Sequence, residues 1–231
     1  MQFPFSQQRV LILAPHADDE VIGCGGVIQK FLKENSAVRV VIATFVKGRY
    51  HKFYKEKNRY EVYDGKQRLE ELKRSHAILG VTDCRLLYTD EETVRYHSRL
   101  DAIPKIELIT KLEAEISDFQ PTVVFIPSKT KHQDHTALHE AALSATRPYF
   151  WNGSVIVYET DGEFSFYPNF FVSLTEEEMR IKAKSLEAYQ TQIGSTLHPV
   201  NPETLIIKAK YRGQYIYSPY AEAFEIKRLC G

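Results

Sequence analysis

Short apolar runs alternate with longer amphipathic segments along most of this chain. Near-continuous apolar runs are typical of strands buried on both faces of a sheet. They occupy residues 10–14, 38–44, 84–88, 122–127 and 155–158. Weaker runs predict a short strand at residues 170–173 and a final strand at residues 205–210.

Amphipathic segments, with apolar residues three and four positions apart, separate these runs and predict helices. The expected helices span residues 21–35, 64–79, 104–119, 134–145 and 175–192. Thr175 and Glu178 have the spacing of a capping box at the start of the last helix. Residues 45–63 lack a clear period and predict a long loop, and the tail from Tyr211 is mixed. Strands alternating with helices predict an α/β fold: a Rossmann-like three-layer sandwich with a mostly parallel sheet.

Composition narrows the class of protein. The 231 residues suit a single domain spanning 1–231, and 43% apolar content is typical of a globular protein. Thirty basic residues balance thirty acidic ones, which indicates no general attraction to nucleic acid. The three cysteines form no CxxC pair, no run reaches the roughly 18 apolar residues of a membrane helix, and the first residues lack a signal-peptide pattern. We therefore expect a cytoplasmic protein without membrane insertion.

The densest chemistry follows the first predicted strand, at residues 15–26 (PHADDEVIGCGG). His16, Asp18, Asp19 and Glu20 cluster there. Buried charges are costly unless they are paired, so such a cluster typically binds a cation or transfers protons. Acids in the first turn of a helix also stabilise its dipole by ~0.3–1 kcal/mol each, and that role suits Glu20 and one aspartate but not His16. The glycines lack the GxGxxG order of a phosphate-binding loop.

A second cluster follows the strand at residues 122–127 and contains His132, Asp134, His135 and His139. Ligands bind beyond the carboxyl ends of parallel strands, so both clusters are expected to share one site. One interpretation is a zincin-like pair, His135 and His139, but Thr136 stands where zincins carry the glutamate base. The favoured interpretation joins His135 to His16 and Asp19 around one metal and leaves Asp18 and His132 for proton transfer. Two histidines, one carboxylate and an open position are typical of hydrolytic zinc and of non-haem iron sites.

Five sequence patterns together resemble the LmbE-like (PIG-L) family of metal-dependent N-acetylglucosaminyl deacetylases. The first is residues 14–20 (APHADDE), in which Ala17 replaces the usual proline, and the second is residues 132–135 (HQDH). The others are a helix pattern at residues 68–81, a late pattern at residues 182–192 that contains Tyr189, and YAEAF at residues 220–224. The resemblance covers nearly the whole chain in the right order and implies the LmbE-like version of the predicted fold.

The resemblance implies roles for particular residues. It makes His16, Asp19 and His135 the metal ligands and Asp18 the general base. His132 would stabilise the oxyanion and protonate the leaving amine, and Asp134 would orient a histidine. The expected substrate contacts are Arg68 and Asp90.

The implied activity is zinc-dependent removal of an N-acetyl group from an N-acetylated amino sugar or a GlcNAc-containing conjugate. Fe²⁺ or another divalent ion is the alternative metal, and a small-molecule amino sugar is the expected partner. The sequence leaves open a homo-oligomer, a metal amidase or deformylase acting on a non-sugar amide, and a non-catalytic glycan-binding module.

Overall fold

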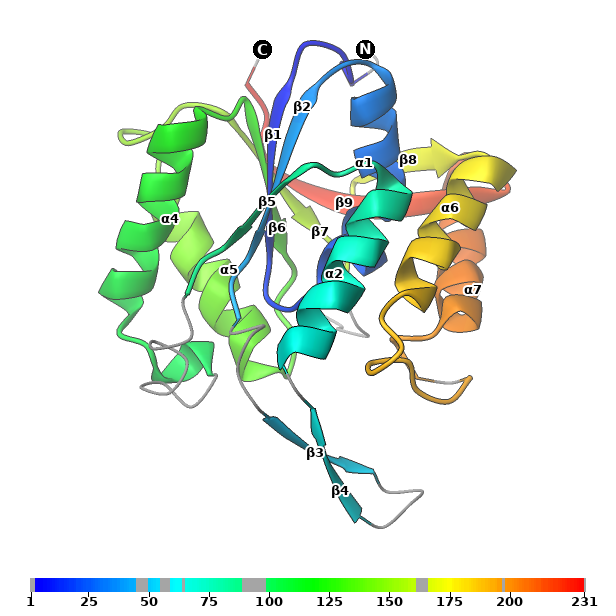
Figure 1. Ribbon diagram of the computed structural model, residues 1–231. Helices are drawn as coiled ribbons and strands as arrows, with labels where there is room; N and C mark the ends of the chain where they lie inside the picture. The colour runs from blue at the N-terminus through cyan, green and yellow to red at the C-terminus, as the bar shows by residue number, and fades with distance from the viewer. Residues whose placement is uncertain are drawn as a thin grey trace.

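A seven-stranded sheet, in the order β5-β2-β1-β6-β7-β9-β8, forms the centre of the molecule (Figure 1). The structure is a computed structural model that describes residues 3–44, 50–54, 59–63, 65–88, 99–160, 166–196 and 198–230. The strands are β1 (Arg9–Ala14), β2 (Ala37–Ile42), β5 (Asp83–Leu86), β6 (Val123–Pro127), β7 (Ser154–Tyr158), β8 (Phe170–Leu174) and β9 (Tyr220–Arg228). The first five strands in sheet order are parallel, and β9 is antiparallel to both of its neighbours.

Helices cover both faces of this sheet (Figure 1). One face carries α1 (Asp19–Lys33), α2 (Gly65–Leu79), α6 (Glu176–Glu187) and α7 (Pro202–Gly213). The other face carries α4 (Lys105–Phe119), α5 (Gln133–Ala145) and the short helix η1 (Leu100–Ala102), while η2 (Gln214–Ile216) follows α7. The predicted α/β sandwich with a mostly parallel sheet is therefore confirmed. Among the described residues, no helix is long and apolar enough to cross a membrane.

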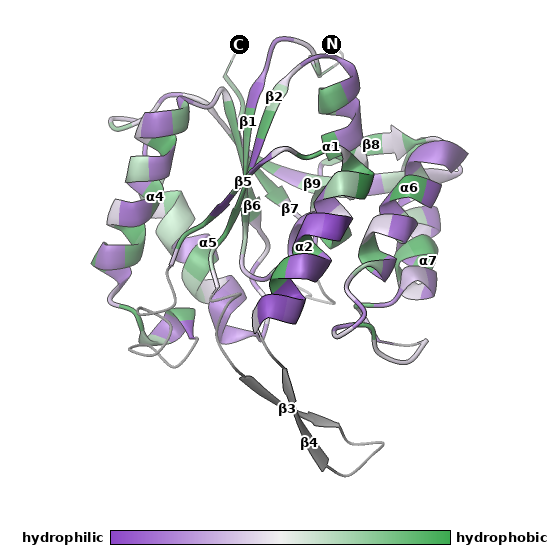
Figure 2. Cartoon of the chain, in the orientation of Figure 1, coloured by the Kyte–Doolittle hydropathy of each residue, from purple (hydrophilic) through white to green (hydrophobic). Residues whose placement is uncertain are grey.

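Strand β1 shows why its sequence is apolar at every position from Val10 to Ala14. Val10, Ile12 and Ala14 pack in the core under α1, while Leu11 and Leu13 pack in the core under α4 and α5. Because a strand directs successive side chains to opposite faces, a strand covered on both faces needs an apolar residue at every position. The colouring by hydropathy shows the same pattern, with green central strands and purple outer helix surfaces (Figure 2).

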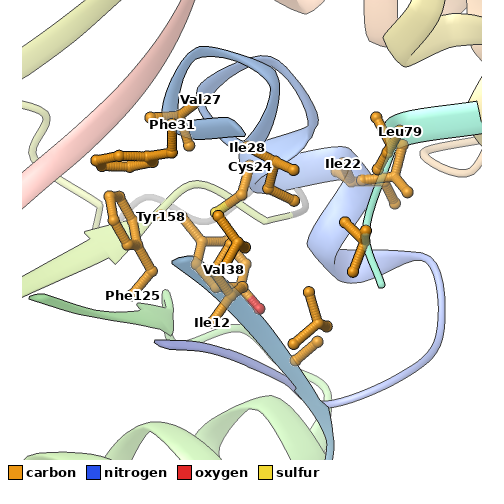
Figure 3. Close-up of a cluster of buried hydrophobic side chains, with 14 of the residues drawn as sticks. Ile12, Ile22, Cys24, Val27, Ile28, Phe31, Val38, Leu79, Phe125 and Tyr158 are labelled. Carbon is orange, nitrogen blue, oxygen red and sulfur yellow. The ribbon is translucent and has the colours of Figure 1, made fainter. Parts of the chain in front are cut away.

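Helix α1 packs unusually close to the sheet because of its glycines. A Cβ atom added at Gly23 would lie 2.1 Å from Cδ2 of the Tyr158 ring. That ring lies among Ile12, Cys24 and Phe125 in the core (Figure 3), and its hydroxyl donates a hydrogen bond of 2.9 Å to the Leu13 carbonyl. Gly23 thus serves helix–sheet packing.

The predicted strand at residues 205–210 was wrong, since this segment lies within α7. The Asn201 side chain caps the helix by accepting a hydrogen bond from the Glu203 N–H, and Pro202 occupies the first turn. Leu205 and Ala209, four residues apart, are buried, whereas Ile207 is 65% exposed. That spacing is helical, but within six residues it is hard to distinguish from a strand.

The tail, which the sequence left unassigned, contains β9 between β7 and β8. Glu222 of β9 forms a buried ion pair with Lys182 of α6, with 2.6 Å between Oε1 and Nζ. Glu222 also accepts hydrogen bonds of 2.7 Å from the Gly26 and Val27 N–H groups, while Lys182 donates to the Ile22 carbonyl at 2.9 Å. This pair therefore ties α6 and β9 to the backbone of α1.

Other boundaries differ from the prediction in smaller ways. The segment predicted as one long loop contains an antiparallel pair, β3 (Tyr50–Tyr54) and β4 (Arg59–Tyr63). The capping box of Thr175 and Glu178 is confirmed, but α6 ends at Glu187 rather than at residue 192. The predicted start of α2 at Asp64 lies outside the described residues.

We predict that Gly23→Ala destabilises the protein by about 1–3 kcal/mol, because the new methyl group would overlap the Tyr158 ring. The measurement is urea unfolding of Gly23→Ala, Tyr158→Leu and the double variant. A favourable coupling energy in this cycle is expected, since removing the ring makes room for the methyl group. Strictly additive losses would contradict the close contact.

Candidate metal centre

The topology brings the two histidine-containing loops together. Strands β1 and β6 are parallel neighbours, with Val10 opposite Val123 and Ile12 opposite Phe125. The chain runs from β1 to β2 on one side, whereas β6 lies on the other side, so the strand order reverses at β1. A crevice forms beyond the carboxyl ends of strands at such a switch point. The loops that begin at Pro15 and Ser128 both leave from this point.

Three side-chain atoms of the first two motifs form a nearly equilateral triangle. Nδ1 of His16 lies 3.0 Å from Oδ2 of Asp19, and Nε2 of His135 lies 3.3 Å from both of these atoms. A tetrahedral zinc ion with bonds of about 2.0–2.2 Å separates its ligand atoms by about 3.3–3.5 Å. Asp19 and His135 are buried, and His16 is partly exposed. The spacing of these donors therefore fits a small divalent ion.

His132 adds a third imidazole to this cluster. His16, His132 and His135 each offer one ligand atom, and the three atoms lie within 4.8 Å of one another, so they also form a candidate metal site. However, Nδ1 of His132 accepts a hydrogen bond of 3.2 Å from the Asp134 N–H and so caps α5. Only Nε2 of His132 remains for a ligand, and this side chain is 47% exposed. The tighter triangle with Asp19 is the better match to a metal.

Asp134 holds His16 in place. Its Oδ2 lies 3.1 Å from Nε2 of His16, and its Oδ1 accepts a hydrogen bond of 2.9 Å from the Leu100 N–H of η1. Metal-binding histidines typically donate their second ring N–H to a carboxylate, which fixes the tautomer and the ring orientation. This contact leaves Nδ1 of His16 directed at Asp19 and His135.

The charges around His16 favour a bound cation. Burial lowers the pKa of His16, but hydrogen bonds to Asp134 and Asp19 outweigh it and raise the pKa to about 10. Burial likewise opposes ionisation of Asp19, yet His135 and His16 hold the pKa of its carboxyl group well below the usual range. The cluster thus stabilises positive charge between its carboxylates, and a bound metal ion would supply that charge in place of a proton.

Asp18 lies beside this cluster in an unusual backbone conformation. Its φ of 143° falls where residues other than glycine are strained, at a cost of about 1–3 kcal/mol. Burial raises the pKa of its carboxyl group to about 8, opposed by Arg68, whose Nη1 lies 4.0 Å from Oδ2 of Asp18. Backbone strain and a raised carboxyl pKa together are typical of functional sites.

The two expected substrate contacts have different outcomes. Arg68 is buried on α2, where its Nη2 donates a hydrogen bond of 3.0 Å to the Ala17 carbonyl. Arg68 therefore binds the backbone of the loop that contains Ala17 and also faces the Asp18 carboxyl group. Asp90 lies outside the described residues.

His139 is held by the backbone rather than by the cluster. Its Nδ1 lies 2.7 Å from the carbonyl oxygen of Pro127, and His139 is not among the three clustered histidines. This geometry disfavours the zincin-like pair with His135.

Sequence reasoning missed the surroundings of Glu20, which it treated as an acid at a helix terminus. Glu20 is fully buried; its Oε2 accepts a hydrogen bond from the Asp18 N–H, and its Oε1 accepts one from the Tyr189 hydroxyl. Nε2 of His76 lies 3.3 Å from the same Oε1. The available signal was Tyr189 itself, a fixed position in the late pattern at residues 182–192.

Comparison with known proteins identifies the class to which this fold and cluster belong. Residues 11–146 match the model of the PIG-L family, described as GlcNAc-PI de-N-acetylase. The match covers more than half of the chain, which therefore belongs to this family of deacetylases.

Particular relatives extend the likeness over most of the chain. The diacetylchitobiose deacetylase of Thermococcus kodakarensis is 28% identical, over 95% of this chain and 83% of the relative. A probable N-acetyl-alpha-D-glucosaminyl L-malate deacetylase 2 of Bacillus anthracis is 24% identical, over 86% and 87% of the two chains. The structure of N,N'-diacetylchitobiose deacetylase from Pyrococcus horikoshii matches the fold with a TM-score of 0.74 and 24% identity, covering 97% of this chain and 86% of that one.

We predict that His135→Ala loses its bound metal while His139→Ala keeps it. His135 contributes an atom of the triangle, whereas Nδ1 of His139 lies against the Pro127 carbonyl. The measurement is the metal content of each purified variant, with about one ion per chain expected for the parent protein. Loss of metal from His139→Ala with retention in His135→Ala would restore the zincin-like pair.

Proposed function

We propose that this protein is a zinc-dependent hydrolase that removes the N-acetyl group from an N-acetylated amino sugar or a GlcNAc-containing conjugate. The observation that carries the proposal is the triangle of His16, Asp19 and His135 beside the buried carboxyl group of Asp18. The names of the Thermococcus and Bacillus relatives support an acetylated sugar as the substrate.

His16, Asp19 and His135 would hold the metal. Two imidazoles and one carboxylate suit zinc, with Fe²⁺ or another divalent ion as the alternative. When bound, such an ion acidifies water and polarises the acetyl carbonyl as a Lewis acid. Asp134 would keep His16 in the correct tautomer through the contact at 3.1 Å.

Asp18 would act as the general base. A base works best when its pKa is near the working pH, and burial raises the pKa of Asp18 to about 8. Its carboxyl group accepts the proton of the attacking water, and the carbon–oxygen bond to the acetyl carbon forms. The protonated Asp18 then returns the proton to the amine nitrogen as the carbon–nitrogen bond breaks, so acetate and a free amine leave.

His132 would stabilise the oxyanion. Burial, and then the nearby His16, lower the pKa of His132, which favours a neutral imidazole near pH 7. Because Nδ1 accepts the Asp134 N–H, the hydrogen of the neutral ring is on Nε2, which can donate to the oxyanion. The structure thus favours Asp18 over His132 as the group that protonates the leaving amine.

Two other functions use the same side chains. A metal amidase or deformylase acting on a non-sugar amide would need the same ligands and the same base. A non-catalytic glycan-binding module would not need a strained, buried aspartate beside the metal ligands. That strain at Asp18 favours catalysis.

We predict that Asp18→Asn retains metal but lowers kcat by about 10²–10⁴-fold, the usual contribution of general acid–base catalysis. The amide is nearly isosteric with the carboxyl group but cannot accept the proton. Steady-state kinetics and metal analysis of the same sample test this prediction. Unchanged turnover in a metal-loaded variant would exclude Asp18 as the base.

The direct test of function is acetate release from a panel of N-acetylated amino sugars. The matched controls are simple N-acetyl amines, assayed for acetate, and N-formyl amines, assayed for formate. We expect acetate from a GlcNAc-type compound, loss of activity after chelation, and recovery when zinc is returned. Release only from the non-sugar amides would support the amidase alternative. Bound metal with glycan binding, but without any hydrolysis, would support the binding module.

A further inference from the structure

The backbone at Asp18 does not adopt its conformation unaided. Asp18 has φ 143° and ψ −29°, in a region that residues with side chains rarely occupy. Such a conformation persists only where its surroundings over-determine it. The surrounding contacts therefore decide where the Asp18 carboxyl group lies relative to the metal ligands.

Glu20 makes the contact that acts on Asp18 directly. Its Oε2 accepts the Asp18 N–H at 2.9 Å, and Glu20 is fully buried. The carbonyl group of Asp18 is held separately, since it accepts the Val21 and Ile22 N–H groups at the start of α1. The peptide groups on both sides of Asp18 are thus fixed by hydrogen bonds.

Two side chains from distant parts of the sequence hold Glu20 in turn. Oε1 accepts the hydroxyl group of Tyr189, which follows α6, and lies 3.3 Å from Nε2 of His76 on α2. The guanidinium group of Arg68 lies 5.9 Å from the centre of the Tyr189 ring and donates to the Ala17 carbonyl. A buried cluster of Glu20, Arg68, His76 and Tyr189 therefore binds the loop at both Ala17 and Asp18.

We propose that Glu20 is a positioning residue for Asp18, and that Tyr189 and His76 anchor Glu20. The proposal rests on the proposed function, in which Asp18 is the base. A carboxyl group can make both sets of contacts because it has two acceptor oxygens. One accepts the Asp18 N–H, and the other faces Tyr189 and His76. Among the described residues, the hydrogen-bond partners of Glu20 are Asp18, Tyr189 and His76 rather than an atom of the triangle, so in this scheme it acts through Asp18.

The substitutions are chosen to separate positioning from general packing. Glu20→Ala removes both contacts, whereas Glu20→Gln keeps the shape and can direct its one carbonyl oxygen at the Asp18 N–H if its amide faces Tyr189. Tyr189→Phe removes only the hydroxyl group. The matched control is Glu71→Gln on α2, because Glu71 is equally buried but accepts hydrogen bonds from the N–H and hydroxyl groups of Thr191 rather than from the Asp18 N–H.

The experiment measures kcat, KM and metal content with the acetylated sugar that the parent protein hydrolyses. Misplacing a reacting group by about 1 Å costs up to about 10²-fold in rate, so we expect such a fall in kcat for Glu20→Ala. Smaller falls are expected for Glu20→Gln and Tyr189→Phe, with KM and metal content unchanged throughout. Glu71→Gln is expected to keep the kcat of the parent. If Glu20→Ala does not fold, the other two variants carry the test.

Hydrogen exchange supplies a readout that does not depend on activity. The Asp18 amide is expected to exchange faster in Glu20→Gln and Tyr189→Phe than in the parent, and at the parent rate in Glu71→Gln. Parent kcat and parent exchange in the Glu20 variants, with Asp18→Asn still inactive, would overturn the positioning role and leave the proposed function intact. An equal loss of kcat in Glu71→Gln with Asp18 exchange at the parent rate would also overturn it, because kcat would then fall without any loosening of Asp18. If the parent hydrolyses no amide, the proposed function fails, and exchange alone then decides whether Glu20 holds Asp18.

Discussion

The parallel pairing of β1 with β6 is the constraint on which the rest of this molecule depends. It places the carboxyl ends of two strands, more than a hundred residues apart in sequence, side by side at the point where the strand order reverses. His16 and His135 can approach to 3.3 Å only because of this pairing. The helices on both faces bury β6 and all of β1 after Arg9, which gives the loops a rigid base.

Each acid of the first loop has a different partner, and this division explains how three carboxyl groups share a buried turn. Asp19 faces two imidazoles, Asp18 faces the guanidinium group of Arg68, and Glu20 accepts hydrogen bonds from the Asp18 backbone and Tyr189. Burial of an acid is tolerated when such partners are present. The arrangement also separates their tasks, since only Asp19 lies in the triangle of ligand atoms.

Residues of the two late sequence patterns, 182–192 and 220–224, contact helix α1, which begins in the same loop. Lys182 donates a hydrogen bond to the Ile22 carbonyl of α1, and Glu222 accepts one from the Gly26 N–H, while the Tyr189 hydroxyl donates to Glu20. The late pattern at residues 182–192 and the YAEAF pattern at residues 220–224 thus both supply buried contacts to one helix. Packing at Gly23 brings that helix close enough to the sheet for these contacts to form.

The sequence by itself determined the alternation of strands and helices and the two histidine clusters, because apolar period and motif spacing are local properties. It also predicted that the clusters share one site, because both follow strands of a parallel sheet, whose carboxyl ends lie together. The predicted ligand atoms come together in the structure, while their role in metal binding stays a proposal. The sequence did not predict β9, because the pairing of this strand depends on distant neighbours. The strand predicted at residues 205–210 was wrong because a short apolar run fits the period of a helix as well as that of a strand. Only the tertiary structure revealed the contacts of Glu20 and the backbone strain at Asp18, because Glu20 meets His76 and Tyr189, which are distant from it in the sequence.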